Sequence, residues 1–417
     1  MIKSNYQNGA GELVSLLAEK FNKYSKSKNL DIELNLIFFG KKNSSETFEY
    51  FEDFVESHFL KKFEKYELIF LNDLLIGKFG EHLLDLKSYV ANDKRELYTN
   101  QPFYKHCFYK GKWISLPIFL DLTLLLSNEE LLNKYHKEVP KTWEELYQTG
   151  KEIMDKENPN RDKPLYGYNG LFYDGEGGTC SLYEYFYSNR NSVDDPMPNP
   201  SSKESIEAIK LLKKIKDDIS SDMKFQENEK GFEENLSDSE FVFSKFWYTP
   251  NTVMNSGKKV SILPGSKPGI SGSIVGVNGF GINKYVKDEK AIKAAAEIIS
   301  YFSSLEFQKE LLLEFGLPSG ILNLYDDDEI CKTVNCEFFK SFQIITRPTA
   351  EVDDYEEYSI EFRDSVYSYL YGNNTVEKAL EITSKLVKSN QSSGSLRNAS
   401  VNVFSILVSL LLFFISF

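Results

Sequence analysis

The chain has 417 residues, of which 41% are hydrophobic and 14% aromatic, and its formal net charge is −13 at pH 7. This length is more than one hydrophobic core serves, so we expect two lobes. The acidic balance and the lack of a basic stripe argue against nucleic acid as a partner. The four histidines and four cysteines have no metal-binding spacing, and no catalytic triad or phosphate loop is recognisable, so we predict no metal, no cofactor and no catalytic residue.

The first part of the chain alternates helices with strands, a pattern typical of a parallel sheet covered by helices on both faces. The predicted elements are a helix over 12–24, a strand over 31–38, a helix over 47–65 and a strand over 67–71. Ligands bind beyond the carboxyl ends of strands in such sheets. Asn72 and Asp73 directly follow the strand over 67–71 and therefore occupy such a position, although Asn-Asp is also typical of a simple turn.

A single acid interrupts the most apolar part of the chain. Asp121 separates the runs 114–120 and 122–126, which are typical of buried strands. A lone carboxylate there is costly unless it has a partner or faces a cleft. Asp121 is therefore either a salt-bridged structural residue or a cleft residue on a strand that crosses between lobes. Farther along, Thr142 and Glu145 form a capping box that starts a helix.

The second half of the chain mixes helices with glycine-rich and aromatic segments. The glycine loop at 174–178 has no following Lys-Ser/Thr, so we do not expect it to bind phosphate. The glycine-punctuated run at 273–283 is predicted to pass back between the lobes, which makes 117–123 and 273–279 the hinge segments. The predicted helices are 201–219, two within 289–315, then 355–373 and 375–389.

The cysteines permit two interpretations. Cys331 and Cys336 enclose four residues, a loop short enough for a local disulfide, and Cys107 and Cys180 are candidates for a second bridge. The alternative is four buried thiols.

The two termini give conflicting indications about the destination of the protein. Residues 401–417 carry no charge and would span about 26 Å as a helix, a little less than a bilayer core. With the small residues at 392–395, they resemble a GPI-attachment signal; a membrane-anchor helix is the second choice and a core helix the third. The N-terminus has no apolar signal segment, so we expect that the true N-terminus is missing here.

Asn-x-Ser/Thr acceptors agree with secretion without establishing it. They occur at Asn43, Asn235, Asn373, Asn390 and Asn398.

The order of the segments resembles the family 1 extracellular solute-binding proteins, which have the type II periplasmic-binding-protein fold and include maltose-binding proteins. The matching stretches are ELIFLNDLL, KWISLPIFLDLTLLLSNEELLNKY, VPKTWEEL, SIVGVNGFGINKY, AIKAAAEIISYFSSLEFQKELLLEFGLPS and TVEKALEITSKLV. The resemblance covers most of residues 8–389 and implies two α/β lobes that close on a ligand. It departs from the family at the start, where the first strand is absent or reduced to a few residues.

The resemblance also implies domain boundaries. Lobe 1 would comprise 1–120 and 279–324, and lobe 2 would comprise 121–278 and 325–389. Residues 390–417 would form a linker and the hydrophobic tail.

The resemblance implies a set of ligand-binding residues. Aromatic rings stack on sugar faces, while carboxylates and amides accept hydrogen bonds from hydroxyl groups. We expect Asp121 and Trp247 to face each other across the lobes, although Trp247 and Tyr183 are also typical core aromatics. The full set is Asn8, Gly11, Asp73, Asp121, Tyr173, Tyr183, Trp247 and Asn278.

These observations predict a monomeric extracellular solute-binding protein, held at the cell surface by its tail, that captures a sugar or oligosaccharide between its lobes. The bacterial family delivers its solute to a membrane transporter, but a GPI-like tail is not bacterial, so the sequence does not predict a transporter as partner. The alternatives are a surface hydrolase that uses paired carboxylates and the ectodomain of a ligand-sensing receptor.

Overall fold

The fold is known from a computed structural model that describes residues 2–4, 10–39, 47–234, 240–250, 257–352 and 354–390. Side chains are not described for residues 2–4, 10–14, 38–39, 47–50 and 233–234. The chain forms two compact units. Unit 1 comprises Met1–Leu122, Tyr248–Pro250 and Val275–Ser341, and unit 2 comprises Thr123–Trp247, Asn251–Ile274 and Phe342–Phe417. The chain leaves one unit for the other inside both predicted hinge segments, 117–123 and 273–279. The predicted lobe ranges stay a prediction, and this division places 325–341 in unit 1.

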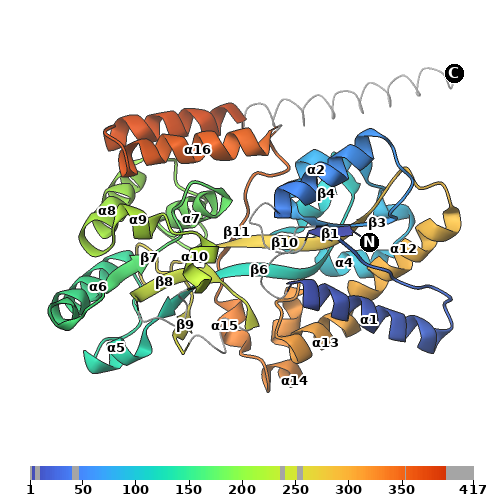
Figure 1. Cartoon of the computed structure of the whole chain (residues 1–417), viewed down its shortest axis with the longest axis horizontal. Coiled ribbons are helices and arrows are strands. Elements are labelled where there is room, and N and C mark those ends of the chain that lie inside the picture. Colours follow the sequence, from blue (N-terminus) through green and yellow to red (C-terminus); the bar gives the residue numbers. More distant parts are fainter. Residues whose placement is uncertain are drawn as a thin grey trace. The chain divides into compact units, whose positions relative to one another are not determined.

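Unit 1 contains a mixed sheet in the order β2-β1-β3-β10-β6 (Figure 1). Its strands are β1 (Ile2–Ser4), β2 (Ile37–Phe39), β3 (Leu68–Asn72), β10 (Ser273–Ile282) and the first part of β6 (Leu116–Ser127). The neighbours of β1 are parallel to it, whereas β10 is antiparallel to β3 and to β6. The first strand is thus present with three residues, which is one of the two possibilities left open by the resemblance, a reduced strand and not an absent one.

Helices accompany this sheet. They are α1 (Ala10–Lys28), α2 (Thr47–Leu60), α3 (Ile76–Phe79), α4 (Asn92–Thr99), α12 (Glu289–Phe302), α13 (Leu305–Phe315), α14 (Asp328–Cys331) and α15 (Cys336–Lys340), and a two-stranded ribbon of β4 (Phe108–Tyr109) and β5 (Lys112–Trp113) completes the unit. Phe59 and Val55 of α2 pack with Ile69 and Leu71 of β3 in the core.

The predicted strand over 31–38 is mostly wrong, because only its end belongs to β2. Residues 31–36 have no regular structure. Their backbone groups bond side chains of α1 instead: Asn22 bonds both the N–H and the carbonyl of Leu34, and the Ser25 hydroxyl bonds both groups of Ile32. The alternating apolar residues fit a strand, but these side-chain bonds replace strand pairing.

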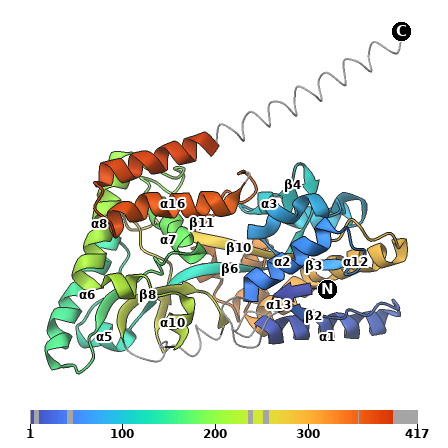
Figure 2. The same ribbon diagram turned by 45° about the horizontal axis from the view of Figure 1, so that its top comes forward.

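Unit 2 contains the sheet order β6-β8-β7, with β9 beside β6 and β11 beside β10. Its strands are β7 (Tyr166–Asn169), β8 (Phe241–Trp247), β9 (Lys259–Ser261) and β11 (Ile344–Ile345), and its helices are α5 (Glu129–Lys134), α6 (Trp143–Glu157), α7 (Glu176–Tyr187), α8 (Lys203–Ile219), α9 (Asp222–Phe225), α10 (Glu229–Glu234), α16 (Tyr355–Leu370) and a helix over 376–390. The helix α16 packs beside α7 (Figure 2). The predicted capping box is confirmed, since Thr142 and Glu145 bond each other's backbone at the start of α6.

A buried ion pair in unit 2 includes a carboxylate that bonds β6 and β10, the two strands shared with unit 1. Lys245 Nζ of β8 lies 2.8 Å from Glu184 Oε2 of α7, and both side chains are at most 2% exposed. Glu184 Oε1 accepts from the N–H of Ile274 at 2.9 Å and from the Thr123 hydroxyl. Ser273 Oγ also accepts from the Thr123 N–H at 3.0 Å. The carboxylate of Glu184 therefore anchors β6 and β10 where they enter unit 2.

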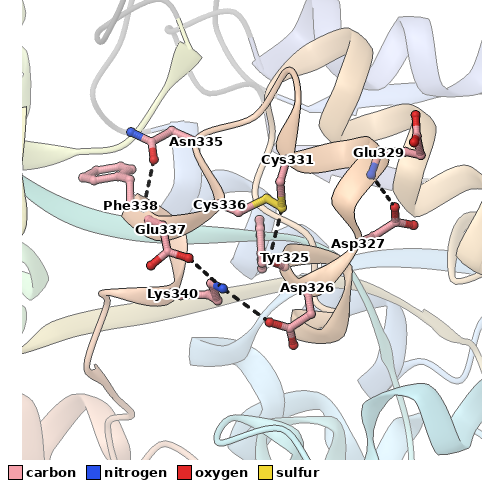
Figure 3. Close-up of a disulfide and its surroundings, with 10 residues drawn as sticks. All are labelled: Tyr325, Asp326, Asp327, Glu329, Cys331, Asn335, Cys336, Glu337, Phe338 and Lys340. Atoms are coloured by element: carbon pink, nitrogen blue, oxygen red, sulfur yellow. Dashed lines mark hydrogen bonds and ion pairs between the residues drawn. A yellow bond between two sulfur atoms is a disulfide. The ribbon is translucent and has the colours of Figure 1, made fainter.

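One of the two predicted disulfides is present. Cys331 and Cys336 are bonded at the junction of α14 and α15, near Tyr325 and Lys340 (Figure 3). Cys107 and Cys180 are free, buried and in different units, so the predicted second bridge is wrong.

We predict a specific thiol count from this arrangement. Burial raises the pKa of the Cys180 thiol to about 12 and raises that of Cys107 as well, so neither forms a thiolate at neutral pH. A chromogenic thiol reagent should react slowly with the native protein, find two thiols per chain in denaturant and find all four after reduction. A Cys331→Ser, Cys336→Ser variant should give two thiols with or without reductant. Four thiols in unreduced denatured protein would contradict the assignment.

The predicted anchor and most glycosylation sites lie outside the described residues. Those positions are 391–417, Asn43, Asn235 and Asn398. Asn373 is exposed in a turn and Asn390 is half-buried at the end of the last helix, and glycosylation of either stays a prediction. Within the described ranges, no helix has the length and apolar character needed to cross a membrane.

Candidate functional site

Unit 1 brings three polar side chains together on neighbouring strands. Asn278 of β10 lies opposite Asn72 of β3, and Asp121 of β6 lies opposite Gly276 of β10. The Asn278 amide donates to Asp121 Oδ2 at 2.7 Å, and its Oδ1 accepts from Asn72 Nδ2 at 3.3 Å. A Cβ atom at Gly276 would lie 3.2 Å from the Asp121 carboxylate, so glycine leaves room for that side chain. We name Asn72, Asp121 and Asn278 the polar cluster.

The polar cluster joins two residues of the predicted ligand-binding set to Asn72, which is not in that set. Asp121 and Asn278 are 157 residues apart and were both predicted to bind ligand. Asn72 was predicted to lie either at a ligand-binding position or in a simple turn. Its position at the carboxyl end of β3 was the signal that pointed to it, because ligands of such sheets bind there.

Asp73 supports the polar cluster from inside unit 1. Its carboxylate is 1% exposed, accepts from the Val277 N–H at 3.1 Å and lies 3.0 Å from His106 Nδ1. Val277 immediately precedes Asn278, so Asp73 fixes the strand at that residue. Burial favours this supporting role for Asp73 over the predicted direct contact with ligand.

Unit 2 gathers two predicted aromatic residues around a carboxylate. Trp247 ends β8, and its indole Nε1 donates to Glu229 Oε1 of α10 at 3.2 Å. The hydroxyl of Tyr173 accepts from the Gly177 N–H at 3.3 Å. Burial, followed by the charge and hydrogen bond of Glu229, raises the pKa of Tyr173, so its hydroxyl stays protonated and donates to Glu229. All three side chains are half-buried. We name Tyr173, Glu229 and Trp247 the aromatic cluster.

Glycine at position 177 makes the aromatic cluster possible. A Cβ atom there would lie 2.5 Å from Glu229 Oε1 and 2.7 Å from the ring of Tyr173. The glycine loop at 174–178 therefore lets a tyrosine pack against the start of α7. Glu229 was missed from the sequence, because nothing local distinguishes it from the other acids between 222 and 239.

The charged side chains at the start of α7 form ion pairs with arginines from later in the chain. Glu176 accepts from Arg347 Nη1 at 2.7 Å, from the Tyr355 hydroxyl at 2.6 Å and from Ser359 Oγ at 2.7 Å. Arg363 donates to Asp174 Oδ1 at 3.2 Å. These bonds fasten α7 to α16 and to the segment that precedes it.

The remaining predicted ligand residues are not part of either cluster. Tyr183 is 6% exposed, and its hydroxyl lies 2.6 Å from that of Tyr358 in the core of unit 2, so we assign it a packing role. Asn8 lies outside the described residues. Gly11 lies in the first turn of α1, among side chains that are not described. Asp121 and Trp247 belong to different units, and their predicted facing arrangement stays a prediction.

The two clusters can bind a ligand by hydrogen bonding and by stacking of aromatic rings. They offer carboxylate and amide groups and the faces of a tryptophan and a tyrosine. Among the described residues, no group of His, Cys, Asp and Glu is arranged to hold a metal ion.

Comparison with known proteins identifies similar sequences. The family model described as bacterial extracellular solute-binding protein matches residues 78–337, more than half of the chain. A protein of Deinococcus radiodurans named probable ABC transporter-binding protein is 27% identical over 330 residues, which are 73% of this chain and 75% of that protein.

Solved structures have the same fold. Maltose-bound MalE3 of T. maritima is 22% identical with a TM-score of 0.74, covering 93% of this chain and 98% of that one. The maltose/maltodextrin-binding domain MalE of Bdellovibrio bacteriovorus bound to maltotriose is 15% identical with a TM-score of 0.64, covering 94% and 98%. A solute-binding protein of Agrobacterium radiobacter in complex with ribitol is 19% identical with a TM-score of 0.65, covering 91% and 95%. The predicted fold class, α/β of the maltose-binding type, is confirmed.

Proposed function

We propose that this chain, which belongs to the bacterial extracellular solute-binding proteins, binds a carbohydrate. The observation that carries the proposal is the aromatic cluster, in which Trp247 and Tyr173 are held by one carboxylate, Glu229. Rings fixed in this way stack on the C–H faces of a sugar, and the carboxylate accepts from its hydroxyl groups.

The polar cluster supports the same ligand class. Asp121 and Asn72 are half-buried and offer an acceptor and an amide donor at the end of β3, while the buried Asn278 orients both of them. Sugar hydroxyls both donate and accept. The solved relatives were bound to maltose, maltotriose and ribitol, all rich in hydroxyl groups. A hydroxyl-rich, uncharged ligand therefore fits both clusters.

We also propose that the protein works outside the cytoplasm and passes its ligand to a membrane transport system. The family description and the name of the Deinococcus relative support this placement. The disulfide between Cys331 and Cys336 fits an oxidising environment. Attachment to a membrane through the uncharged residues 401–417 belongs to the proposal as well, but not by a GPI anchor, which a bacterial transport protein would not carry.

A thermal-shift screen tests the proposed function. Mono- and disaccharides, sugar alcohols, peptides and organic acids are added to the full chain, and a ligand that binds only the folded state raises Tm with its concentration. At 100 times its Kd a ligand should stabilise by about 2.7 kcal/mol. We expect hits among the sugars, with the sugar recovered unchanged. Hits only among peptides or organic acids, or consumption of the sugar, would refute binding of carbohydrate as the function.

A further inference from the structure

The two hydrogen-bond donors of the aromatic cluster both point to the same acceptor. Trp247 Nε1 donates to Glu229 Oε1 at 3.2 Å, and the Tyr173 hydroxyl is bonded to Glu229 as well. Each of these groups has a single hydrogen to give. Of the three side chains, the cluster therefore leaves ring faces and carboxylate lone pairs for a ligand, but no donor.

Three cations of unit 2 are paired with carboxylates other than Glu229. Lys245 Nζ lies 5.6 Å from the centre of the Trp247 ring, yet its ion pair is with Glu184. Arg347 is paired with Glu176, and Arg363 with Asp174. The charge of Lys258 lies over the ring of Phe232 on α10, 5.5 Å from its centre. Because those ion pairs do not involve Glu229, its negative charge acts on any group of a ligand that contacts the ring of Trp247.

We infer that Glu229 sets the charge specificity of the site, admitting neutral sugars and rejecting acidic ones. A hydroxyl group can donate to the carboxylate, whereas a sugar carboxylate or phosphate meets a like charge and finds no donor among the three side chains. Specificity of this kind comes from a repulsive element as much as from attraction. The inference rests on the proposed function and adds the class of sugar to it.

Glu229→Gln separates the charge from the geometry. The glutamine carbonyl oxygen still accepts from Trp247 Nε1, so the indole keeps its orientation while the charge disappears. The probes are matched pairs: glucose with glucuronate, galactose with galacturonate, and maltitol with maltobionate. Isothermal titration on the full chain gives, for each protein, the ratio of the two Kd values within a pair.

We expect the wild type to favour the neutral member of a pair by at least about tenfold, since like charges in contact cost more than the equivalent free energy. Glu229→Gln should reduce that preference about tenfold while changing the affinity for the neutral sugar much less. Glu207→Gln is the control, because it removes the same charge from an exposed position on α8 of the same unit. The control should keep the wild-type ratio.

The outcomes distinguish this inference from the proposed function. If the wild type binds neutral and acidic members equally, or if Glu229→Gln still rejects acidic sugars as the wild type does, the inference is overturned and carbohydrate binding stands. If the control shifts the ratio as much as Glu229→Gln, net charge is the cause and the inference is again overturned. If the wild type binds only acidic sugars, the inference is overturned and carbohydrate binding stands. If it binds no sugar at all, the proposed function fails and the inference falls with it.

Discussion

Lys245→Ala should destabilise unit 2 by about 3–5 kcal/mol, the loss expected when one partner of a buried ion pair is removed. Lys245 is 1% exposed, and its Nζ lies 2.8 Å from Glu184 and 2.7 Å from Ser181 Oγ. Without the ammonium group, the Glu184 carboxylate stays buried with its charge uncompensated. Urea unfolding followed by tryptophan fluorescence measures the change, since Trp143 and Trp247, two of the three tryptophans, lie in unit 2.

Two further variants separate the buried charge from lost packing. Lys385→Ala breaks an exposed pair with Glu381 on the last helix of the same unit and should cost less than about 0.5 kcal/mol. Lys245→Met combined with Glu184→Gln removes both charges but retains an acceptor for the Ile274 N–H, so it should cost less than Lys245→Ala alone. A loss for Lys245→Ala as small as that of Lys385→Ala would contradict the assignment of a buried pair.

Local sequence patterns predicted the elements whose signals are themselves local. The capping box at Thr142 needs only residues within one turn. β3 is one apolar run, and β6 consists of two apolar runs on either side of Asp121, which suit buried strands. The segment 31–36 shows the limit of this approach. Its alternation is typical of a strand, but the groups that bond it, Asn22 and Ser25, lie on the preceding helix.

The residues of the candidate site likewise divide into those with a local sequence signal and those without one. Asp121 was selected because a carboxylate in an apolar run needs a partner, and the structure supplies Asn278. The sequence alone left a salt bridge as an alternative, because the partner is 157 residues away and is brought near only by the pairing of β6 with β10. Glu229 could not be selected at all, since its significance comes from an indole and a phenol on other elements.

Tyr183 and Trp247 show that residue type alone does not predict which aromatic side chain can contact a ligand. Both were predicted to stack on sugar, and both lie within segments rich in aromatic residues. Tyr183 is in the middle of α7, on a helix whose residues 177–186 are all buried. Trp247 ends its strand, where the burial of β8 gives way to a half-buried residue. Position relative to the end of an element therefore decides which aromatic residue is available to a ligand.

Asp121→Ala should weaken sugar binding by about 1–3 kcal/mol, the penalty for a polar partner left unsatisfied, or about 5- to 150-fold in Kd. The substitution removes an acceptor for sugar hydroxyls and also leaves the Asn278 amide without the oxygen that lies 2.7 Å away. Because Asp121 is half-buried rather than fully buried, we expect Tm without ligand to change little. Isothermal titration with the best sugar from the screen measures the loss.

The controls for Asp121→Ala distinguish a ligand contact from support of the fold. Asp121→Asn keeps an oxygen that can accept from Asn278, so it should lose less affinity than alanine does. Glu64→Ala removes a carboxylate of unit 1 whose pair with Lys287 is exposed, and it should bind sugar as the wild type does. Unchanged affinity in Asp121→Ala, with a lowered Tm, would show that Asp121 only joins β6 to β10. Equal losses in the alanine and asparagine variants would instead show that the charge itself, and not the bond to Asn278, binds the sugar.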